Sequence, residues 1–186
     1  DRYRFLEYHK WKYSGKVFLP LMNPTTVKRT PVLMARIEGG IINSYNKYKR
    51  SPFGTYYMGG DMMSGSMGNY MNETIGLRGY KNGSIAGANY DYAYSYMKAS
   101  LELRYPLIFE QSTTVWVLGF AEAGNAWSDI SRYNPFDLKR SAGVGVRVMM
   151  PMIGLLGLDW GYGFDRPNGY NERGGSNIHF VLGRDL

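Results

Sequence analysis

One arginine stands in a sequence context that can bring its charge against a buried partner. It lies in Gly76-Leu77-Arg78-Gly79-Tyr80, within a long stretch, Ser44 to Tyr90, that has no evident secondary structure. The flanking glycines let the backbone fold tightly around Arg78, because glycine adopts conformations that other residues avoid. Loops of this length are usually functional or disordered. The alternative is a glycine-flanked turn with a solvated arginine.

Two glutamates are candidate partners for this arginine. Glu122 belongs to Phe120-Ala121-Glu122-Ala123-Gly124-Asn125-Ala126-Trp127 and, in a strand, points away from the face of Val117 and Gly119. Glu102 lies on the corresponding face of the preceding predicted strand. A guanidinium and a carboxylate form strong bidentate pairs where water is scarce. We therefore predict that Arg78 lies within hydrogen-bonding distance of Glu122 or Glu102.

The sequence offers little for catalysis or metal binding. It has no cysteine, which excludes disulfides and thiolate metal sites. Its two histidines, His9 and His179, stand at opposite ends of the chain, where a nucleophile and its base have no evident way to meet. We expect no catalytic residues, no metal and no cofactor.

Composition and charge narrow the class of protein. The chain has 24 glycines, 17 tyrosines and 16% aromatic residues, which favours strands and turns. Its net charge of +7 fits nucleic acid, anionic lipid headgroups or a solvated surface as partners, and the scattering of the basic residues argues against nucleic acid. No uninterrupted apolar run is long enough for a membrane helix. The chain is therefore either soluble or crosses a membrane as strands.

Alternation of side chains favours the membrane. Met97 to Tyr105 has one apolar face and one face with Lys98, Ser100, Glu102 and Arg104. Gly143 to Met150 and Leu156 to Phe164 have bulky apolar residues on one face and glycine or charge on the other. Bulky residues outside and small or charged residues inside suit a wide, wet lumen. We predict an all-β, antiparallel transmembrane β-barrel whose lipid-facing residues include Leu101, Leu103, Val144, Val146, Leu158 and Trp160.

The number of strands predicts a larger barrel. The other predicted strands are Tyr3 to Pro20, Val32 to Asn43, Thr113 to Trp127 and Asn177 to Leu186, which brings the total to seven. Short connections alternate with long ones, as in outer-membrane barrels. Bacterial single-chain barrels have even strand numbers, so we expect residues 1–186 to be part of a barrel with further strands before Asp1.

These features together resemble the BamA family of outer-membrane assembly factors. Leu77-Arg78-Gly79-Tyr80 matches the family's Val/Leu-Arg-Gly-Phe/Tyr loop motif, and Glu122 stands where the family has an aspartate in a Phe/Trp-Asp-x-Gly-x-x-Trp strand. Gly183 occupies the position of a kink-prone glycine, and Leu186 replaces the usual terminal aromatic residue. The resemblance extends over essentially the whole chain, including the alternating residues of the last strand: Ile178, Phe180, Leu182, Arg184 and Leu186.

The resemblance implies a sixteen-stranded barrel of the bacterial outer membrane, preceded by POTRA domains, with this chain as its last seven strands. The loop at about 44–90 would insert into the lumen, and Arg78 would hold it there. The implied function is to fold and insert other β-barrel proteins. Nascent outer-membrane proteins, accessory periplasmic lipoproteins and outer-membrane lipid are the implied partners.

The last strand offers a physical route to that function. Gly183 has no side chain and can bend the strand, so we expect loose pairing beyond it and a lateral seam that can open. An open seam would offer backbone hydrogen bonds to an incoming strand. Two alternatives remain: a related translocator of two-partner secretion, and a plain outer-membrane channel or porin.

Overall fold

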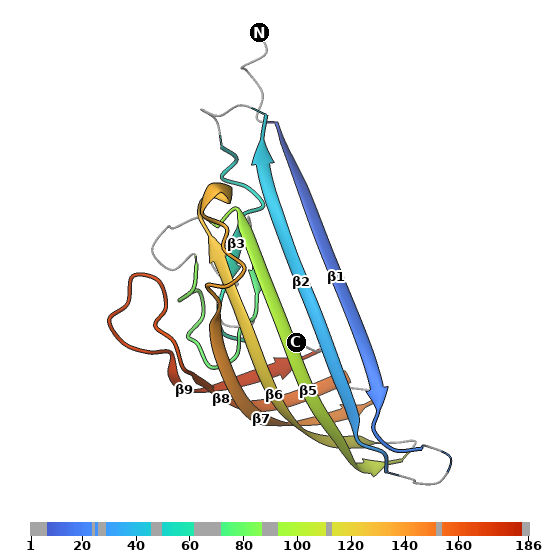
Figure 1. Cartoon of the computed structure of the whole chain (residues 1–186). Coiled ribbons are helices and arrows are strands. Elements are labelled where there is room, and N and C mark those ends of the chain that lie inside the picture. The colour runs from blue at the N-terminus through green and yellow to red at the C-terminus, as the bar shows by residue number, and fades with distance from the viewer. Residues whose placement is uncertain are drawn as a thin grey trace.

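Seven long strands form one antiparallel sheet in the order β1-β2-β5-β6-β7-β8-β9. The computed structural model describes residues 7–23, 25, 29–45, 50–61, 72–86, 93–110, 113–151 and 154–183. Figure 1 shows that strand direction turns steadily from β1 to β9, so the sheet is strongly twisted and curved. The long strands are β1 Tyr8–Pro20, β2 Val32–Ser44, β5 Ser95–Phe109, β6 Thr114–Trp127, β7 Lys139–Met150, β8 Gly154–Gly163 and β9 Gly175–Leu182.

The predicted neighbour-to-neighbour pairing is confirmed, and several predicted strand ends are wrong. Each long strand pairs antiparallel with the next long strand along the chain. β5 continues past Tyr105 to Phe109, because Pro106 is accommodated by a register shift between Pro106 and Ile108 instead of ending the strand. β8 ends at Gly163, one residue before the predicted end. Residues 3–6 of the predicted first strand and residues 184–186 of the predicted last strand lie outside the described residues.

Connections alternate in length as predicted after β2, but not before it. Residues 110–113 and 151–153 are short connections at one end of the sheet, whereas residues 21–31 at that end are as many as residues 128–138 and 164–174 at the other end. One of the longer ones contains a short 3-10 helix, η1 Ile130–Arg132, whose N-cap Asp129 accepts a hydrogen bond from the Ser131 backbone. In the described part of the chain, no helix is long and apolar enough to span a membrane.

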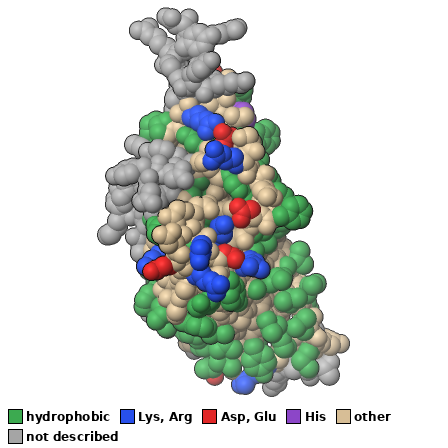
Figure 2. Space-filling view, turned by 60° about the vertical axis from the view of Figure 1, so that its left-hand side comes forward, with side chains coloured by type: hydrophobic (Ala, Val, Ile, Leu, Met, Phe, Trp, Pro, Cys, Tyr) green, Lys and Arg blue, Asp and Glu red, His purple; other side chains and the backbone are tan. Residues whose placement is uncertain are grey.

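The convex face of the sheet is apolar and exposed. Of the six residues predicted to face lipid, Leu101, Leu103, Val144, Leu158 and Trp160 are 43–58% exposed, and Val146 is half-buried. Their side chains therefore point outward and do not pack in a closed core, as predicted. Hydrophobic side chains also cover much of the lower surface in Figure 2, at the end with the short connections.

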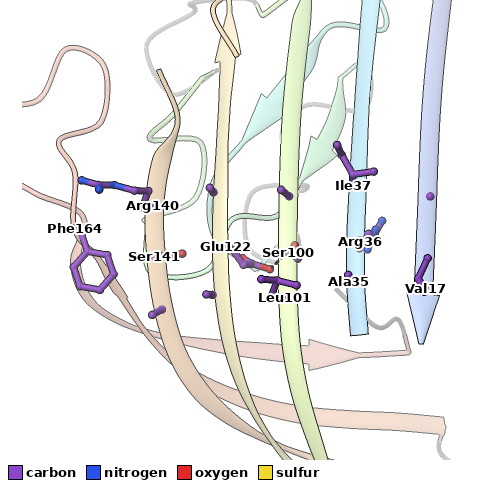
Figure 3. Close-up of a pocket in the computed structure, with 15 residues that line it drawn as sticks. Val17, Ala35, Arg36, Ile37, Ser100, Leu101, Glu122, Arg140, Ser141 and Phe164 are labelled. Carbon is purple, nitrogen blue, oxygen red and sulfur yellow. Dashed lines mark hydrogen bonds between the residues drawn. The ribbon is translucent and has the colours of Figure 1, made fainter. Parts of the chain in front are cut away.

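A shallow depression interrupts this outer face. Figure 3 shows that it extends from Val17 on β1, past Ala35 and Leu101, to Arg140 and Phe164 at the opposite side. The strands there carry small outward residues, Ala99, Ala121, Ala123 and Ala142. Ser100 and Glu122 also border the depression, but their positions in the strand alternation assign their side chains to the inner face. The outer surface is thus uneven but apolar, which suits contact with acyl chains.

We call the connection between β2 and β5, residues 45–94, the inner loop; its described residues, 45, 50–61, 72–86 and 93–94, lie against the inner face of the sheet. The sequence predicted no secondary structure there, and this is wrong: β3 Tyr56–Met58 and β4 Glu73–Ile75 pair in parallel within it. Two strands of three residues leave no alternation to recognise. The main hydrophobic core lies between the inner loop and the sheet and consists of Ile42, Tyr56, Met58, Ile75, Leu77, Tyr80, Ile85, Ala86, Ala93, Tyr96 and Ala126.

Candidate functional site

The inner loop is attached to both edges of the sheet. At the β1 edge, Lys10 and Lys12 form ion pairs with Glu73 of β4, and Lys10 Nζ also donates to the Gly54 carbonyl at 2.8 Å. Burial raises the pKa of Glu73, but the two lysines outweigh this and hold that pKa below its usual value, so the carboxylate stays charged. At the β9 edge, Gly79 is hydrogen-bonded to side chains of the last strand. The loop therefore crosses the whole inner face.

The tip of the inner loop, Arg78-Gly79-Tyr80, fits closely against β8 because glycine stands on both sides of the contact. Gly79 has φ +83°, and a Cβ on it would lie 2.8 Å from the Tyr162 carbonyl carbon. Gly161 and Gly163 of β8 face the Gly79 backbone, and a Cβ on Gly174 would meet the Tyr80 ring at 2.6 Å. Gly161 and Gly163 were predicted to line a wide, wet lumen. They instead make room for the loop tip.

Substituting one of these glycines should displace the tip. A Cβ at Gly161 would lie 2.8 Å from the Gly79 nitrogen and 3.2 Å from the Phe120 ring. We expect Gly161→Ala to destabilise the protein by about 1–3 kcal/mol through overpacking. Gly119→Ala is the matched control, because a Cβ there meets nothing within 4 Å on the outer face. Equal free energies of unfolding for the two variants, measured in lipid vesicles, would contradict this close packing.

Arg78 lies at the centre of a buried cluster of charges. Its Nη2 donates to Glu102 Oε1 at 2.5 Å and to Glu122 Oε1 at 2.7 Å, and its Nη1 donates to Asp159 at 3.2 Å. The guanidinium also lies 3.7 Å above the centroid of the Phe120 ring, a cation–π geometry. The side chains of Arg78 and all three carboxylates are 0% exposed. The carboxylates come from three strands, β5, β6 and β8.

Glu122 binds both the side chain and the backbone of Arg78. Its Oε2 accepts from the Arg78 backbone N–H at 2.9 Å, and its Oε1 accepts from Arg78 Nη2 and from Ser100 Oγ. Lys98 lies 3.2 Å from the same Oε1. The carboxylate therefore fixes the position of the loop backbone as well as the charge. Lys98 and Arg104, which contacts Glu102, bring further positive charge to the cluster.

A second arginine extends the cluster along β7 and β8. Arg147 donates to Asp159 through Nη1 at 2.5 Å and Nη2 at 2.7 Å, a bidentate pair whose members are both 0% exposed. Asp159 thus joins Arg147 to Arg78. A Cβ on Gly157 would collide with the Arg147 side chain at 2.7 Å, so that glycine provides the space for it.

Tyr80 attaches the tip to the far end of the site. Its hydroxyl donates to the Arg140 carbonyl at 2.7 Å and accepts from the Asp165 backbone N–H at 3.3 Å. Burial raises the pKa of Tyr80 to about 12, so the hydroxyl keeps its proton at physiological pH. Asp165 in turn accepts two hydrogen bonds from the Arg140 guanidinium, at 2.9 and 3.0 Å.

The structure brings the predicted loop motif and both predicted carboxylates together. Gly76 and Leu77 are buried, and Leu77 pairs with Gly60 through the backbone. Arg78 contacts both Glu102 and Glu122, where the sequence predicted one or the other. The predicted residues of the last strand, Ile178, Phe180 and Leu182, lie on the outer face and are 55–65% exposed, away from this cluster. Gly183 has φ +71°, and Leu186 lies outside the described residues.

Among the residues of the site that were not predicted are Arg147, Asp159, Asn177 and His179. Alternation had already placed Asp159 on the inner face with Gly157 and Gly161, and Arg147 with Gly145. A charge on an otherwise glycine-rich inner face was the available signal. His179 and Asn177 carried no such signal, because their partner is the backbone of Gly79. His9, at the opposite edge of the sheet, lies against the Tyr45 ring in a tilted arrangement with ring centroids 5.0 Å apart.

Comparisons with known proteins agree with this geometry. The family model described as the Omp85 superfamily domain matches residues 5–186. No curated protein gives a significant match. The crystal structure of BamA from Haemophilus ducreyi lacking POTRA domains 1-3 is similar, with a TM-score of 0.61 and 21% sequence identity.

The match covers 94% of this chain and 34% of the BamA chain, so this chain spans about a third of the length of that structure. At this identity the likeness shows the fold, a BamA-like antiparallel barrel portion. The match of the family model shows the family and, with it, the location in the outer membrane. The chain belongs to the Omp85 superfamily, a family of outer-membrane β-barrel proteins that insert or translocate other proteins.

Proposed function

We propose that the chain is the C-terminal, seven-strand part of a larger barrel that folds and inserts other β-barrel proteins into the outer membrane through a lateral seam. Nascent outer-membrane proteins are the proposed clients, and accessory periplasmic lipoproteins and outer-membrane lipid the proposed partners. The enclosing barrel would have sixteen strands and POTRA domains before it. No covalent step is involved, so the protein is not an enzyme in this proposal.

The observation that carries the proposal is the position of Arg78. A plain channel needs an open lumen, whereas here the inner loop fills the inner face and Arg78 fastens it to carboxylates of three strands. Burying four ionised groups is costly unless they pair closely, and here they do. A loop held this firmly inside the barrel favours an assembly factor, in which the loop has a defined position, over a pore.

The last strand supports the seam. β9 has eight residues against twelve in β7 and fourteen in β6, and within the described residues it pairs with β8 alone. Pairing to β8 extends as far as Gly183, whose N–H donates to the Leu155 carbonyl at 2.8 Å. The predicted loosening beyond Gly183 falls on residues 184–186, outside the described residues. A short last strand is the easiest place to open a barrel, because it can form few backbone hydrogen bonds with the first strand.

The chemistry of insertion follows from that edge. A β-strand edge presents backbone N–H and C=O groups that must be satisfied inside a membrane, where water is absent. An incoming strand can satisfy them by pairing with β9, which is β-augmentation. The exposed residues Ile178, Phe180 and Leu182 keep the outer side of that edge compatible with lipid.

Folding of a client by the complete protein tests the proposal. In liposomes, we expect the complete protein to accelerate the folding of a urea-unfolded eight-stranded barrel by tenfold or more over empty liposomes. Folding is measured by the gel shift of the folded client. The protein lacks cysteine in residues 1–186, so Leu182→Cys can be cross-linked to a cysteine in the barrel's first strand. This cross-link should abolish the acceleration, and reductant should restore it.

A disulfide between Val17→Cys and Ala35→Cys is the matched control, because these residues are register partners inside the sheet and not at the seam. It should leave the acceleration unchanged. Full activity with the seam closed would contradict the lateral mechanism. Passage of an unfolded client into the liposome interior without insertion would identify a translocator, and ion conductance without client folding would identify a channel.

A further inference from the structure

The last strand holds the tip of the inner loop through two side chains that the family motif does not include. His179 Nε2 accepts a hydrogen bond from the Gly79 backbone N–H at 2.8 Å. Asn177 Nδ2 donates to the Gly79 carbonyl at 3.0 Å. Both polar atoms of Gly79 are therefore bound by β9. His179 is 4% exposed, and its bond to Gly79 is buried.

The two contacts depend on the absence of a side chain at Gly79. Its φ of +83° and the close approach of Tyr162 and Ser141 leave no space for a Cβ. The bare backbone lets side chains of β9, spaced two residues apart on one face, reach its two polar atoms. Asn177 also donates to the carbonyls of Gly174 and Gly175, which fixes its amide in the orientation that Gly79 requires.

Breaking either contact leaves a buried group unsatisfied. When the seam opens, β9 separates from the barrel's first strand, and a shift of β9 away from the inner loop would carry His179 and Asn177 away from Gly79 and leave its N–H and C=O without these partners. Release of the loop would leave the buried Nε2 of His179 without its partner. Each movement therefore makes the other easier, because an energetic coupling between two sites acts in both directions.

We propose that Asn177 and His179 are positioning residues that couple the inner loop to the last strand, so that opening the seam and releasing the loop are one linked event. This rests on the proposed function, in which β9 moves at the seam. The roles are chemically distinct: His179 must present an unprotonated Nε2, with its proton on Nδ1, and Asn177 must present an N–H donor.

Hydrogen exchange of the complete protein in lipid nanodiscs tests the coupling. Peptides covering residues 72–86 report the loop, and peptides covering residues 175–183 report β9. The variant with both Asn177→Ala and His179→Ala should lose about tenfold in protection in both segments, the scale of one or two buried hydrogen bonds. His179→Gln should restore most of the loop's protection in a chain with native Asn177, because the amide oxygen of glutamine can accept the Gly79 N–H.

Ser176→Ala is the matched control on the same strand. Ser176 accepts a hydrogen bond from Trp160 Nε1 on the outer face at 2.8 Å and does not touch the loop. Any change in hydrogen-exchange protection caused by Ser176→Ala should be confined to β9, and the protection of the loop should stay unchanged. Arg78→Lys tests reciprocity, because loosening the loop from the other side should also lower the protection of β9.

Loss of protection in the loop alone, with β9 unchanged in all variants, would overturn the proposal, as would equal effects of Ser176→Ala on the loop. Should the double variant not fold, the single His179→Ala and Arg78→Lys proteins give the same decision. The exchange measurement is independent of client folding. Loss of protection in both segments, with no acceleration of client folding by the wild-type protein, would refute the proposed function alone. Acceleration of client folding, with no shared loss of protection in the variants, would refute this inference alone.

Discussion

Replacing Arg78 with alanine is expected to be the most damaging single substitution in the inner loop. It leaves Glu102, Glu122 and Asp159 buried without the cation that joins them, although Lys98, Arg104 and Arg147 remain beside them. Breaking a buried ion pair by removing one member costs about 3–5 kcal/mol. We expect a loss of this size in the free energy of unfolding, measured by urea titration in lipid vesicles, together with a strong loss of client folding.

Arg78→Lys should recover only part of this loss. Lysine supplies the charge, but its single ammonium lacks the planar fork that contacts three carboxylates at once. Arg50→Ala is the control, since Arg50 is an arginine of the same loop whose ion pair with Asp129 is largely exposed. Exposed pairs contribute about 0–1 kcal/mol. A similar loss for Arg50→Ala and Arg78→Ala would show that the buried cluster has no special role.

Replacing Asp159 with alanine should have the second-largest effect. Asp159 accepts hydrogen bonds from the guanidinium groups of Arg147 and Arg78. Its loss leaves Arg147 buried with the Val146 carbonyl as its one remaining acceptor within the described part of the chain. The expected cost is again about 3–5 kcal/mol, by the same argument. Asp159→Asn should cost less, because the amide oxygen still accepts a hydrogen bond. Urea titration of both variants in vesicles measures the difference.

Asp165→Ala provides the contrast for Asp159, because Asp165 pairs with the exposed guanidinium of Arg140. We expect a loss below about 1 kcal/mol. Hydrogen bonds from Arg140 hold the pKa of Asp165 below its usual value. Its contribution is therefore present above about pH 4, the pKa of an unfolded aspartate, and disappears as the pH falls through the lower, folded pKa. A wild-type advantage that grew on acidification would contradict this assignment.

The sheet could be predicted from the sequence because its two faces differ so strongly. The alternation in Met97 to Tyr105 alone separates Leu101 and Leu103 from Glu102, and the structure places them on opposite faces. The pairing of Arg78 with Glu122 could be predicted for the same reason: one glycine-flanked arginine in the loop and few inward carboxylates leave few combinations. Strand ends were harder to predict. A proline usually ends a strand, whereas Pro106 only shifts the register of β5 against β6.

The rest of the site could not be predicted because it depends on where the loop tip lands. Asp159 was assigned to the inner face, yet nothing in the sequence indicates that β8 passes beside Arg78. His179 and Asn177 bind a glycine backbone, which leaves no pattern of complementary side chains. The glycines of β7 and β8 were read as the lining of an open lumen, since a sequence does not distinguish space for water from space for another segment.

The position of the Arg78 guanidinium in the complete protein, embedded in a lipid nanodisc and determined by cryo-electron microscopy, tests the central claim most directly. We expect it inside the barrel, within hydrogen-bonding distance of Glu102, Glu122 and Asp159, with Gly79 bound to Asn177 and His179 of the last strand. An Arg78 side chain on the extracellular surface, with the three carboxylates facing an open lumen, would contradict the account.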